Sequence, residues 1–123
     1  MKKVTINYHF KNKDRDERYS VEGTYSEGET GFILTFTDGS DCKHKISYIN
    51  DVLSIVFKNE DETYISKYEY IPKELTFGHI SLFGMNSTQK IYTDSVFVNN
   101  DTIVAKYRFD ESDDFCNLHI TIK

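Results

Sequence analysis

The sequence predicts an all-β fold, a single antiparallel up-and-down (meander) β-barrel of about 8–10 strands that takes in residues 1–123. Composition is the first reason, because 12 Ile, 7 Val, 11 Thr, 9 Tyr and 9 Phe stand against a single alanine. β-Branched and aromatic side chains suit a pleated surface, and long helices lack material here. The second reason is an apolar alternation of period two along the whole chain. The third is that no connection exceeds about seven residues, which is too short for a parallel crossover.

The first five strands are expected where apolar residues alternate with polar ones between polar interruptions. The first run ends at KNKDRDE, the second at SEGETG, the third at TDGSD, the fourth at Asn50 and Asp51, and the fifth at KNEDE. Side chains of one parity are apolar in each run, which is typical of a strand with one buried face. The expected strands are 4–10, 19–25, 32–36, 42–48 and 53–57.

Five further strands follow the same pattern. Pro72 ends the sixth run, because proline has no N–H for a ladder and holds the preceding residue extended. The stretch GMNS closes the seventh run, in which Gly78 predicts a close approach or a bulge. Asn99 to Asp101 predict a tight hairpin, since Asn and Asp tolerate positive φ. The expected strands are 64–71, 75–83, 89–98, 103–109 and 116–122, and closure into a barrel would remove the exposed edges of so long a sheet.

Charge and composition exclude several classes of partner. The net charge is −5 and only three residues are arginine, which argues against nucleic acid because phosphate binding requires a basic face. The N-terminal lysines are not followed by the apolar segment of a signal peptide, and no apolar window is long enough for a membrane helix. We therefore expect a cytoplasmic protein with no membrane partner. In that compartment Cys42 and Cys116 are expected to be free thiols rather than a disulfide.

Metal, cofactor and catalytic signatures are weak. Cys42 and His44 share one strand face, but a zinc site needs three or four converging ligands, so we expect no metal. No nucleophile elbow and no phosphate-binding glycine pattern occurs, so we expect no cofactor and assign no catalytic residues. The acidic clusters KDRDE, NEDE and DESDD all fall at turns and are interpreted as solvated loop tips.

Several segments resemble the YwiB-like family. These are VEGTY and GFILTF near the N-terminus, LTFGHISL in the middle, then IVAKYRF and the closing FCNLHITIK. The resemblance extends over about residues 3–123 and implies a calycin-like (lipocalin-like) barrel from a group of small bacterial proteins of unknown function. The family often has an acidic residue after the FG pair, whereas this chain has His79. The family has no established catalytic set, so the resemblance assigns no functional residue.

The barrel interior is the remaining candidate for function. Strand parity is expected to turn several polar side chains inward, among them His79 and Ser81. Buried polar groups need hydrogen-bond partners, which the water or ligand in an internal cavity could supply. The alternative is that the tyrosine rings fill a packed core and send their hydroxyls to the backbone or to the barrel mouth. In residues 64–71 the tyrosines share one face of the expected strand, and Ile65 and Ile71 lie on the other face. If the isoleucines point inward, the tyrosines face outward and form a protein-binding strip. The candidate ligand-binding residues are His44, Tyr48, Tyr64, Tyr68, Tyr70 and His79.

Three functions follow from these alternatives. The first is a non-catalytic barrel that binds a small apolar or amphipathic molecule. The second is a barrel with a filled interior that acts as a protein–protein interaction module or associates with itself as a homodimer. The third is an enzyme with His44 or His79 as general base, which would need a carboxylate or nucleophile within hydrogen-bond reach.

Overall fold

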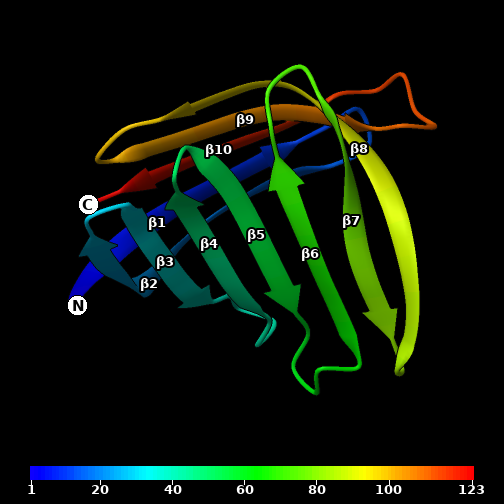
Figure 1. Ribbon diagram of the computed structural model, residues 1–123. Helices are drawn as coiled ribbons and strands as arrows, with labels where there is room; N and C mark the ends of the chain where they lie inside the picture. The colour runs from blue at the N-terminus through cyan, green and yellow to red at the C-terminus, as the bar shows by residue number, and fades with distance from the viewer.

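The computed structural model describes residues 1–123 and forms a closed barrel of ten antiparallel strands (Figure 1). Each strand pairs with its neighbours in sequence, and β1 closes the ring by pairing with both β2 and β10. The predicted all-β meander barrel is therefore confirmed. The strands are β1 (Lys2–Lys11), β2 (Asp16–Gly28), β3 (Gly31–Thr37), β4 (Lys43–Ile49), β5 (Val52–Lys58), β6 (Tyr64–Tyr70), β7 (Leu75–Leu82), β8 (Met85–Val98), β9 (Thr102–Phe109) and β10 (Cys116–Ile122).

The two ends of the chain meet at the closure of the barrel. In the β1–β10 ladder Ile6 lies opposite Ile122. The backbone groups of Thr5 and Lys123 extend the ladder with two hydrogen bonds of 2.8 and 2.9 Å. The first and last segments of the sequence therefore seal the same seam, at the side of the molecule where both termini lie in Figure 1.

Two hairpins are made by two-residue turns with positive φ at both central residues, the geometry that matches the twist of antiparallel strands. Asn50 and Asp51 have φ values of 52° and 66° between β4 and β5. Phe83 and Gly84 have values of 50° and 79° between β7 and β8. The second turn starts β8 at Met85, whereas the sequence led us to expect a start near residue 89. The prediction was wrong here because GMNS was interpreted as a loop, although the turn needs only two residues.

The hairpin predicted at Asn99 to Asp101 is present, but its mechanism differs. None of these residues has positive φ. Instead the Asn99 side-chain oxygen accepts hydrogen bonds from the backbone N–H groups of Asp101 and Thr102, at 3.0 and 2.9 Å. The asparagine therefore supports the turn through its side chain, as Asx turns do.

The tyrosine-rich strand β6 faces inward, which resolves the question that parity left open. Tyr70 and Ser66 are only 4% and 6% exposed, whereas Lys67 and Glu69 on the other face are exposed. The ring of Tyr68 covers Gly78 of β7, where an added Cβ would lie 2.1 Å from the ring. The expected close approach at Gly78 is therefore confirmed, and the tyrosines do not form an outer strip.

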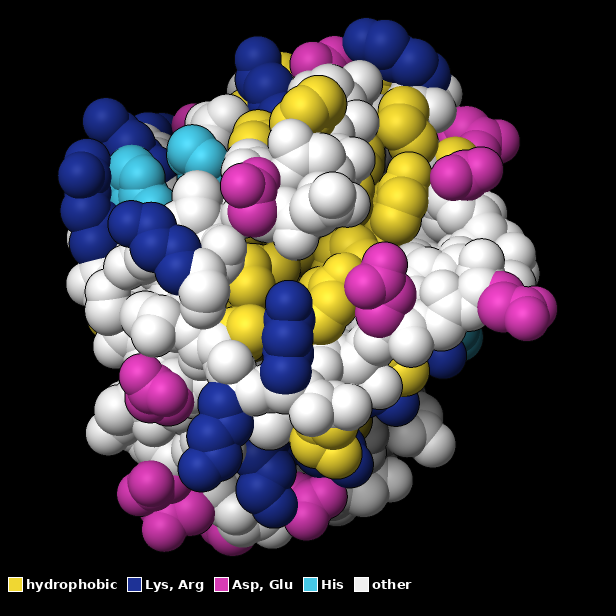
Figure 2. All heavy atoms as spheres, turned by 90° about the vertical axis from the view of Figure 1, so that its left-hand side faces the viewer, with side chains coloured by type: hydrophobic (Ala, Val, Ile, Leu, Met, Phe, Trp, Pro, Cys, Tyr) yellow, Lys and Arg dark blue, Asp and Glu magenta, His cyan; other side chains and the backbone are white.

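The core fills only part of the barrel. The most deeply buried side chains are almost all aliphatic and come from strands all around the ring. They form a compact plug, while most of the inward aromatic residues lie around the remainder of the interior. Figure 2 shows charged side chains of both signs around a band of apolar atoms on one face of the molecule. The largest side chains with less than 2% exposure are Ile6, Leu34, Ile46, Leu53, Ile91, Ile103, Ile120 and Thr93.

Membrane-spanning helices are absent, since no helix in the structure has the length and apolar character to cross a bilayer.

Candidate ligand-binding site

A cavity of about 820 Å³ occupies the part of the barrel that the aliphatic plug leaves free. It opens at the end of the barrel where β1 turns into β2 and β3 turns into β4. Of its 23 lining residues 13 are hydrophobic, and the polar residues from these two turns stand at the rim. This volume falls in the range of small-molecule sites, about 300–1,000 Å³.

Aromatic rings make the wall of the cavity. Tyr8 of β1 and Tyr19 of β2 stack with their ring centroids 4.6 Å apart. Across the interior Tyr70 and Tyr107 meet edge to face at 4.8 Å. These rings come from β1, β2, β6 and β9, and they point into the barrel because of the inward parity of each strand. Ring-to-ring contacts therefore hold the wall on both sides of the interior.

The floor of the cavity is apolar. Ile46 and Leu118, which are 1% and 4% exposed, belong both to the plug and to the cavity lining. Phe10 of β1, also buried, lines the cavity next to the β1–β2 turn. A ligand that entered fully would thus meet aliphatic and aromatic carbon at its inner end.

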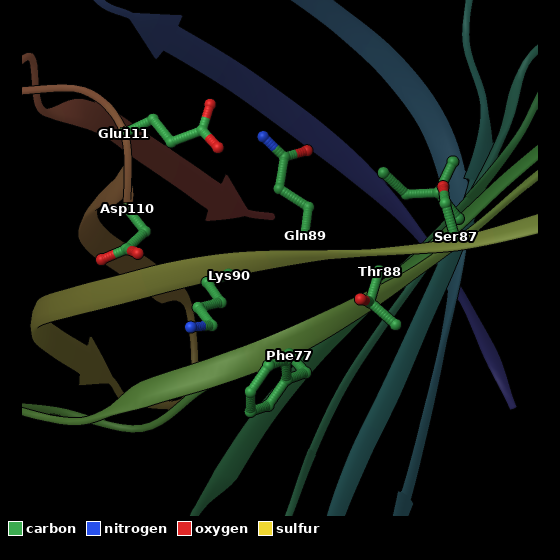
Figure 3. A pocket seen from close by; sticks show the side chains of 8 residues that line it. Phe77, Ser87, Thr88, Gln89, Lys90, Asp110 and Glu111 are labelled. Carbon is green, nitrogen blue, oxygen red and sulfur yellow. The ribbon is translucent and has the colours of Figure 1, made fainter.

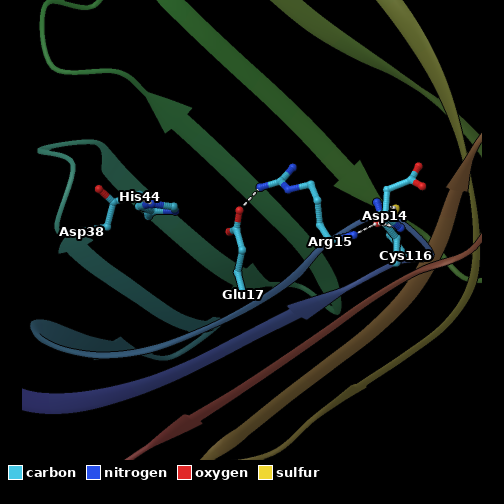
Figure 4. Close-up of polar contacts among 7 residues, drawn as sticks. Asp14, Arg15, Glu17, Asp38, His44 and Cys116 are labelled. Carbon is cyan, nitrogen blue, oxygen red and sulfur yellow. Dashed lines mark hydrogen bonds and ion pairs between the residues drawn. The ribbon is translucent and has the colours of Figure 1, made fainter.

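An ion pair stands at the rim. Arg15 precedes β2, and its guanidinium pairs with the carboxylate of Glu17 (Figure 4). The same guanidinium lies 5.1 Å from the centre of the Phe10 ring, within the range of a cation–π contact. Arg15 and Glu17 have the same parity as Tyr19, which places all three on the cavity side of the chain. This side of the mouth therefore carries a positive and a negative group paired with one another.

A second polar pair lies on the other side of the opening. The Nε2 atom of His44 is 2.9 Å from Oδ2 of Asp38, and His44 is only 9% exposed (Figure 4). The other oxygen of Asp38 accepts backbone hydrogen bonds from Ser40 and Cys42, at 2.9 and 3.1 Å. Burial alone would raise the pKa of Asp38, but the hydrogen bonds from His44 and the two N–H groups outweigh it and lower that pKa. An ionised Asp38 thus holds both the turn and the imidazole in place.

The imidazole is also packed between rings. Its plane stacks on Phe36, with centroids 4.4 Å apart, and Phe57 meets its edge at 5.2 Å. These contacts fix the orientation of His44 at the cavity wall. The general base hypothesis required a carboxylate within reach, and Asp38 meets that single geometric condition. No hydroxyl or thiol is hydrogen-bonded to His44, so the set of a nucleophilic catalyst is not assembled around it.

The tyrosine hydroxyls of the wall remain protonated donors. Burial is the main cause that raises the pKa of Tyr8 to about 12 and the pKa of Tyr68 to about 12. Burial likewise raises the pKa of Tyr70 and of Tyr107 well above the usual value of 10.0. The hydroxyl of Tyr68 already donates to the Gln89 side chain at 3.1 Å. The cavity therefore offers neutral O–H groups and no tyrosinate at physiological pH.

These raised pKa values predict a loss of stability in alkali. Above pH 10.0 the tyrosines of the unfolded chain ionise while Tyr70 and Tyr107 in the folded chain keep their protons, so the free energy of unfolding falls as pH rises. Each unit by which a pKa differs between the two states corresponds to about 1.4 kcal/mol. Urea unfolding between pH 8 and pH 11, about the range over which tyrosine titrates, measures this.

A matched pair of variants tests the cause. Tyr107→Phe should flatten the alkaline fall, whereas Tyr92→Phe, on the outer side of β8, should leave it unchanged. An alkaline fall that is equal in both variants would rule out the buried hydroxyl as its source.

Four of the six candidate ligand-binding residues lie together on the cavity. His44, Tyr64, Tyr68 and Tyr70 all line it. Tyr48 has inward parity but lies toward the other end of β4, half-buried, with its ring 6.2 Å from that of Phe32. It is therefore outside this cavity.

His79 is placed on the opposite side of the sheet from its expected position. Strand parity at β7 turns Gly78 and Ile80 inward, because Ile80 lies opposite the inward Ser66. His79 and its neighbour Ser81 consequently face outward, and the imidazole is exposed. The expectation that these two residues point into the barrel was wrong.

Several residues of the cavity were missed by sequence reasoning. Tyr8, Tyr19 and Tyr107 belong to strands whose faces were interpreted only as core, although the same parity places them on the wall. Arg15 and Glu17 lie in the charged stretch that was interpreted as a solvated loop tip. The parity of Tyr19, extended back by two and four positions, was the signal that could have found them.

Metal-ligating side chains do not converge anywhere in the chain. No group of three or more His, Cys, Asp or Glu residues is placed to hold an ion. Cys42 and Cys116 are both free thiols, as predicted. The Cys42 thiol donates to the carbonyl oxygen of Ser40 at 3.7 Å. The Cys116 thiol is instead buried beneath the Asn12 side chain, with 4.0 Å between Nδ2 and Sγ.

Comparison with known proteins supports the fold. No family model matches the sequence, and no curated protein matches it either. Among solved structures, the crystal structure of the ywiB protein from Bacillus subtilis is similar, with a TM-score of 0.73 at 12% sequence identity. The match covers 98% of this chain and 89% of the other. This chain therefore has a YwiB-like fold.

Proposed function

We propose that this protein binds a small amphipathic molecule in the cavity of its barrel, without catalysing a reaction on it. The observation that carries the proposal is the half-filled interior, with an aliphatic plug at one end and an aromatic cavity of about 820 Å³ at the other. A barrel whose only task is structural gains stability when side chains fill it, since unfilled volume forfeits packing contacts. The unfilled aromatic cavity therefore favours a role in binding a ligand.

The lining indicates the chemistry of that occupant. The buried apolar lining of Ile46, Leu118 and Phe10 suits an apolar or aromatic body. Protonated tyrosine hydroxyls on the wall suit hydrogen-bond acceptors on the ligand, and buried ring faces suit flat molecules. The paired charges of Arg15 and Glu17 at the rim suit a polar group that stays near solvent. We therefore propose a ligand with one apolar end and one polar end.

The similarity of fold to the ywiB protein is compatible with this proposal but is not the evidence for it. Barrels of calycin type enclose a ligand cavity within about eight or more strands. We propose that the chain is a distant cytoplasmic member of the YwiB-like group, with the same type of barrel. A likeness at 12% identity concerns the fold, so the proposed ligand rests on the cavity lining alone.

A thermal-shift screen tests the function. We expect compounds that combine an aromatic or aliphatic body with one polar group to raise the melting temperature in a saturable way. A compound at one hundred times its dissociation constant adds about 2.7 kcal/mol to the free energy of unfolding. Purely polar compounds of equal size serve as controls. A broad panel in which no amphipathic compound stabilises the protein would contradict the proposal.

A further inference from the structure

The first half of β8 is an unprotected strand edge. Residues from Met85 to Tyr92 pair with β7, but β9 pairs with β8 only from Ile91 onward. From Met85 to Gln89 no strand therefore lies on the other side of β8. Every side chain from Met85 to Lys90 is exposed. A cavity of about 450 Å³ separates this edge from Asp110 and Glu111 after β9 (Figure 3).

The hairpin geometry identifies the backbone groups on this edge. The two-residue turn makes Leu82 and Met85 a hydrogen-bonded pair, and such pairs alternate along an antiparallel ladder. Ser87 and Gln89 thus direct their backbone groups toward β7, while Asn86 and Thr88 direct theirs away from it. The carbonyl oxygen of Lys90, of the same parity, accepts a hydrogen bond from the Asp110 N–H at 3.1 Å on that outer side. Asn86 and Thr88 are therefore left with N–H and C=O groups that no strand receives.

We infer that a second copy of this chain pairs with the free edge of β8, antiparallel and about a two-fold axis at Ser87. In this register Asn86 of each copy lies opposite Thr88 of the other, and both are residues with free backbone groups. The two pairs would form about four backbone hydrogen bonds across the axis. A register shifted toward Lys90 would require its carbonyl group, which Asp110 already occupies. The register at Ser87 is thus the self-pairing that uses the free groups best.

Charge favours a second copy at this place over others on the surface. Each chain carries a net charge of −5, so two copies repel one another in general. The edge from Met85 to Gln89 holds no charged residue, so the proposed register brings no like charges opposite one another. The protective devices of natural edge strands, namely charges, prolines and bulges, are all lacking between Met85 and Gln89.

Exposed apolar side chains flank the same edge. Leu82, Phe83 and Met85 are 48%, 76% and 75% exposed, and together they form the tip of the β7–β8 hairpin. In the paired register Met85 lies opposite Gln89 of the other copy and loses water contact there. The interface remains small, so we expect a weak dimer of the transient class. This inference is independent of ligand binding, because it uses the edge of β8 and not the cavity.

Sedimentation equilibrium with lysine variants tests the dimer. Over protein concentrations from about 10 μM to about 1 mM, the wild-type mass should rise from 14.4 kDa toward twice that value. Asn86→Lys with Thr88→Lys places like charges opposite one another twice, and should raise the dissociation constant about tenfold or more. The matched control is His79→Lys with Ser81→Lys, which adds the same charge to the same face one strand away from the edge. It should dimerise like the wild type.

A charge-reversed variant tests the register itself. Asn86→Glu with Thr88→Lys puts opposite charges across the two-fold axis and should restore the dimer. Exchange of the Asn86 and Thr88 amide hydrogens in the wild type should also slow with concentration, while the Ser87 amide, already bonded to β7, should not respond. A wild type that stays at 14.4 kDa throughout would overturn the inference. So would a double-lysine variant that dimerises normally, or a charge-reversed variant that stays as monomeric as the double-lysine one.

Discussion

Gly31→Ala should destabilise the barrel by about 3 kcal/mol or more. Gly31 begins β3 with a φ of +152°, and an added Cβ would lie 1.7 Å from the carbonyl oxygen of Tyr48 on β4. Backbone in such a region costs about 1–3 kcal/mol for an ordinary residue, and relief of the overlap requires movement of backbone rather than of a flexible side chain. Urea unfolding followed by circular dichroism measures the loss.

Gly28→Ala is the matched control, because Gly28 lies directly opposite Gly31 in the β2–β3 ladder. An added Cβ at Gly28 has no neighbour within 4 Å. This variant should stay within about 0.5 kcal/mol of the wild type, as exposed substitutions without steric conflict usually do. Equal effects of the two alanines would refute the close approach of Gly31 to Tyr48.

Ser66→Phe should abolish ligand binding while it leaves the barrel folded. Ser66 is 6% exposed and lines the cavity from the middle of β6. A phenyl ring at this position extends into free volume, where a ligand would lie, and not into the aliphatic plug. We expect a loss of affinity of about one hundredfold or more for any compound found in the screen. The new phenyl ring would overlap with the bound compound where the cavity wall now contacts it. Isothermal titration calorimetry measures the affinity.

Lys67→Phe is the control for this change. Lys67 is the next residue of β6, and its side chain lies on the outer face opposite His79. The same added ring therefore lies outside the barrel and should leave the affinity unchanged. Equal weakening by both substitutions would place the bound compound somewhere other than the cavity.

The barrel was predictable because the apolar alternation within most strands shows which of their faces is buried. Alternation along β1, β3 and β10 is regular, with one parity buried and the other turned to solvent. Short polar connections then leave antiparallel neighbours as the sole option. The same rule failed at β7, where apolar residues occupy both parities. Phe77 is 60% exposed although it is aromatic, and Ile80 has the inward parity. Period two cannot select a face when both faces are apolar.

The composition of the site was predictable only in part, because it depends on cross-strand register and on turns. Tyr68 lies over Gly78, the next position across from it in the β6–β7 register, a contact that requires knowledge of how the two strands align. Asp38 reaches His44 because the β3–β4 turn folds back over the strand end. Arg15 similarly joins Phe10 across the β1–β2 turn. These contacts join separate segments, whereas sequence periodicity describes one segment at a time.

Native mass spectrometry of the protein, purified from cells under mild conditions, is the most direct test of ligand binding in the cavity. We expect a discrete added mass on the 14.4 kDa chain, at a stoichiometry of one per barrel, that is lost in Ser66→Phe and kept in Lys67→Phe. A wild-type protein that appears only at its bare mass, or an added mass that persists in Ser66→Phe, would contradict it.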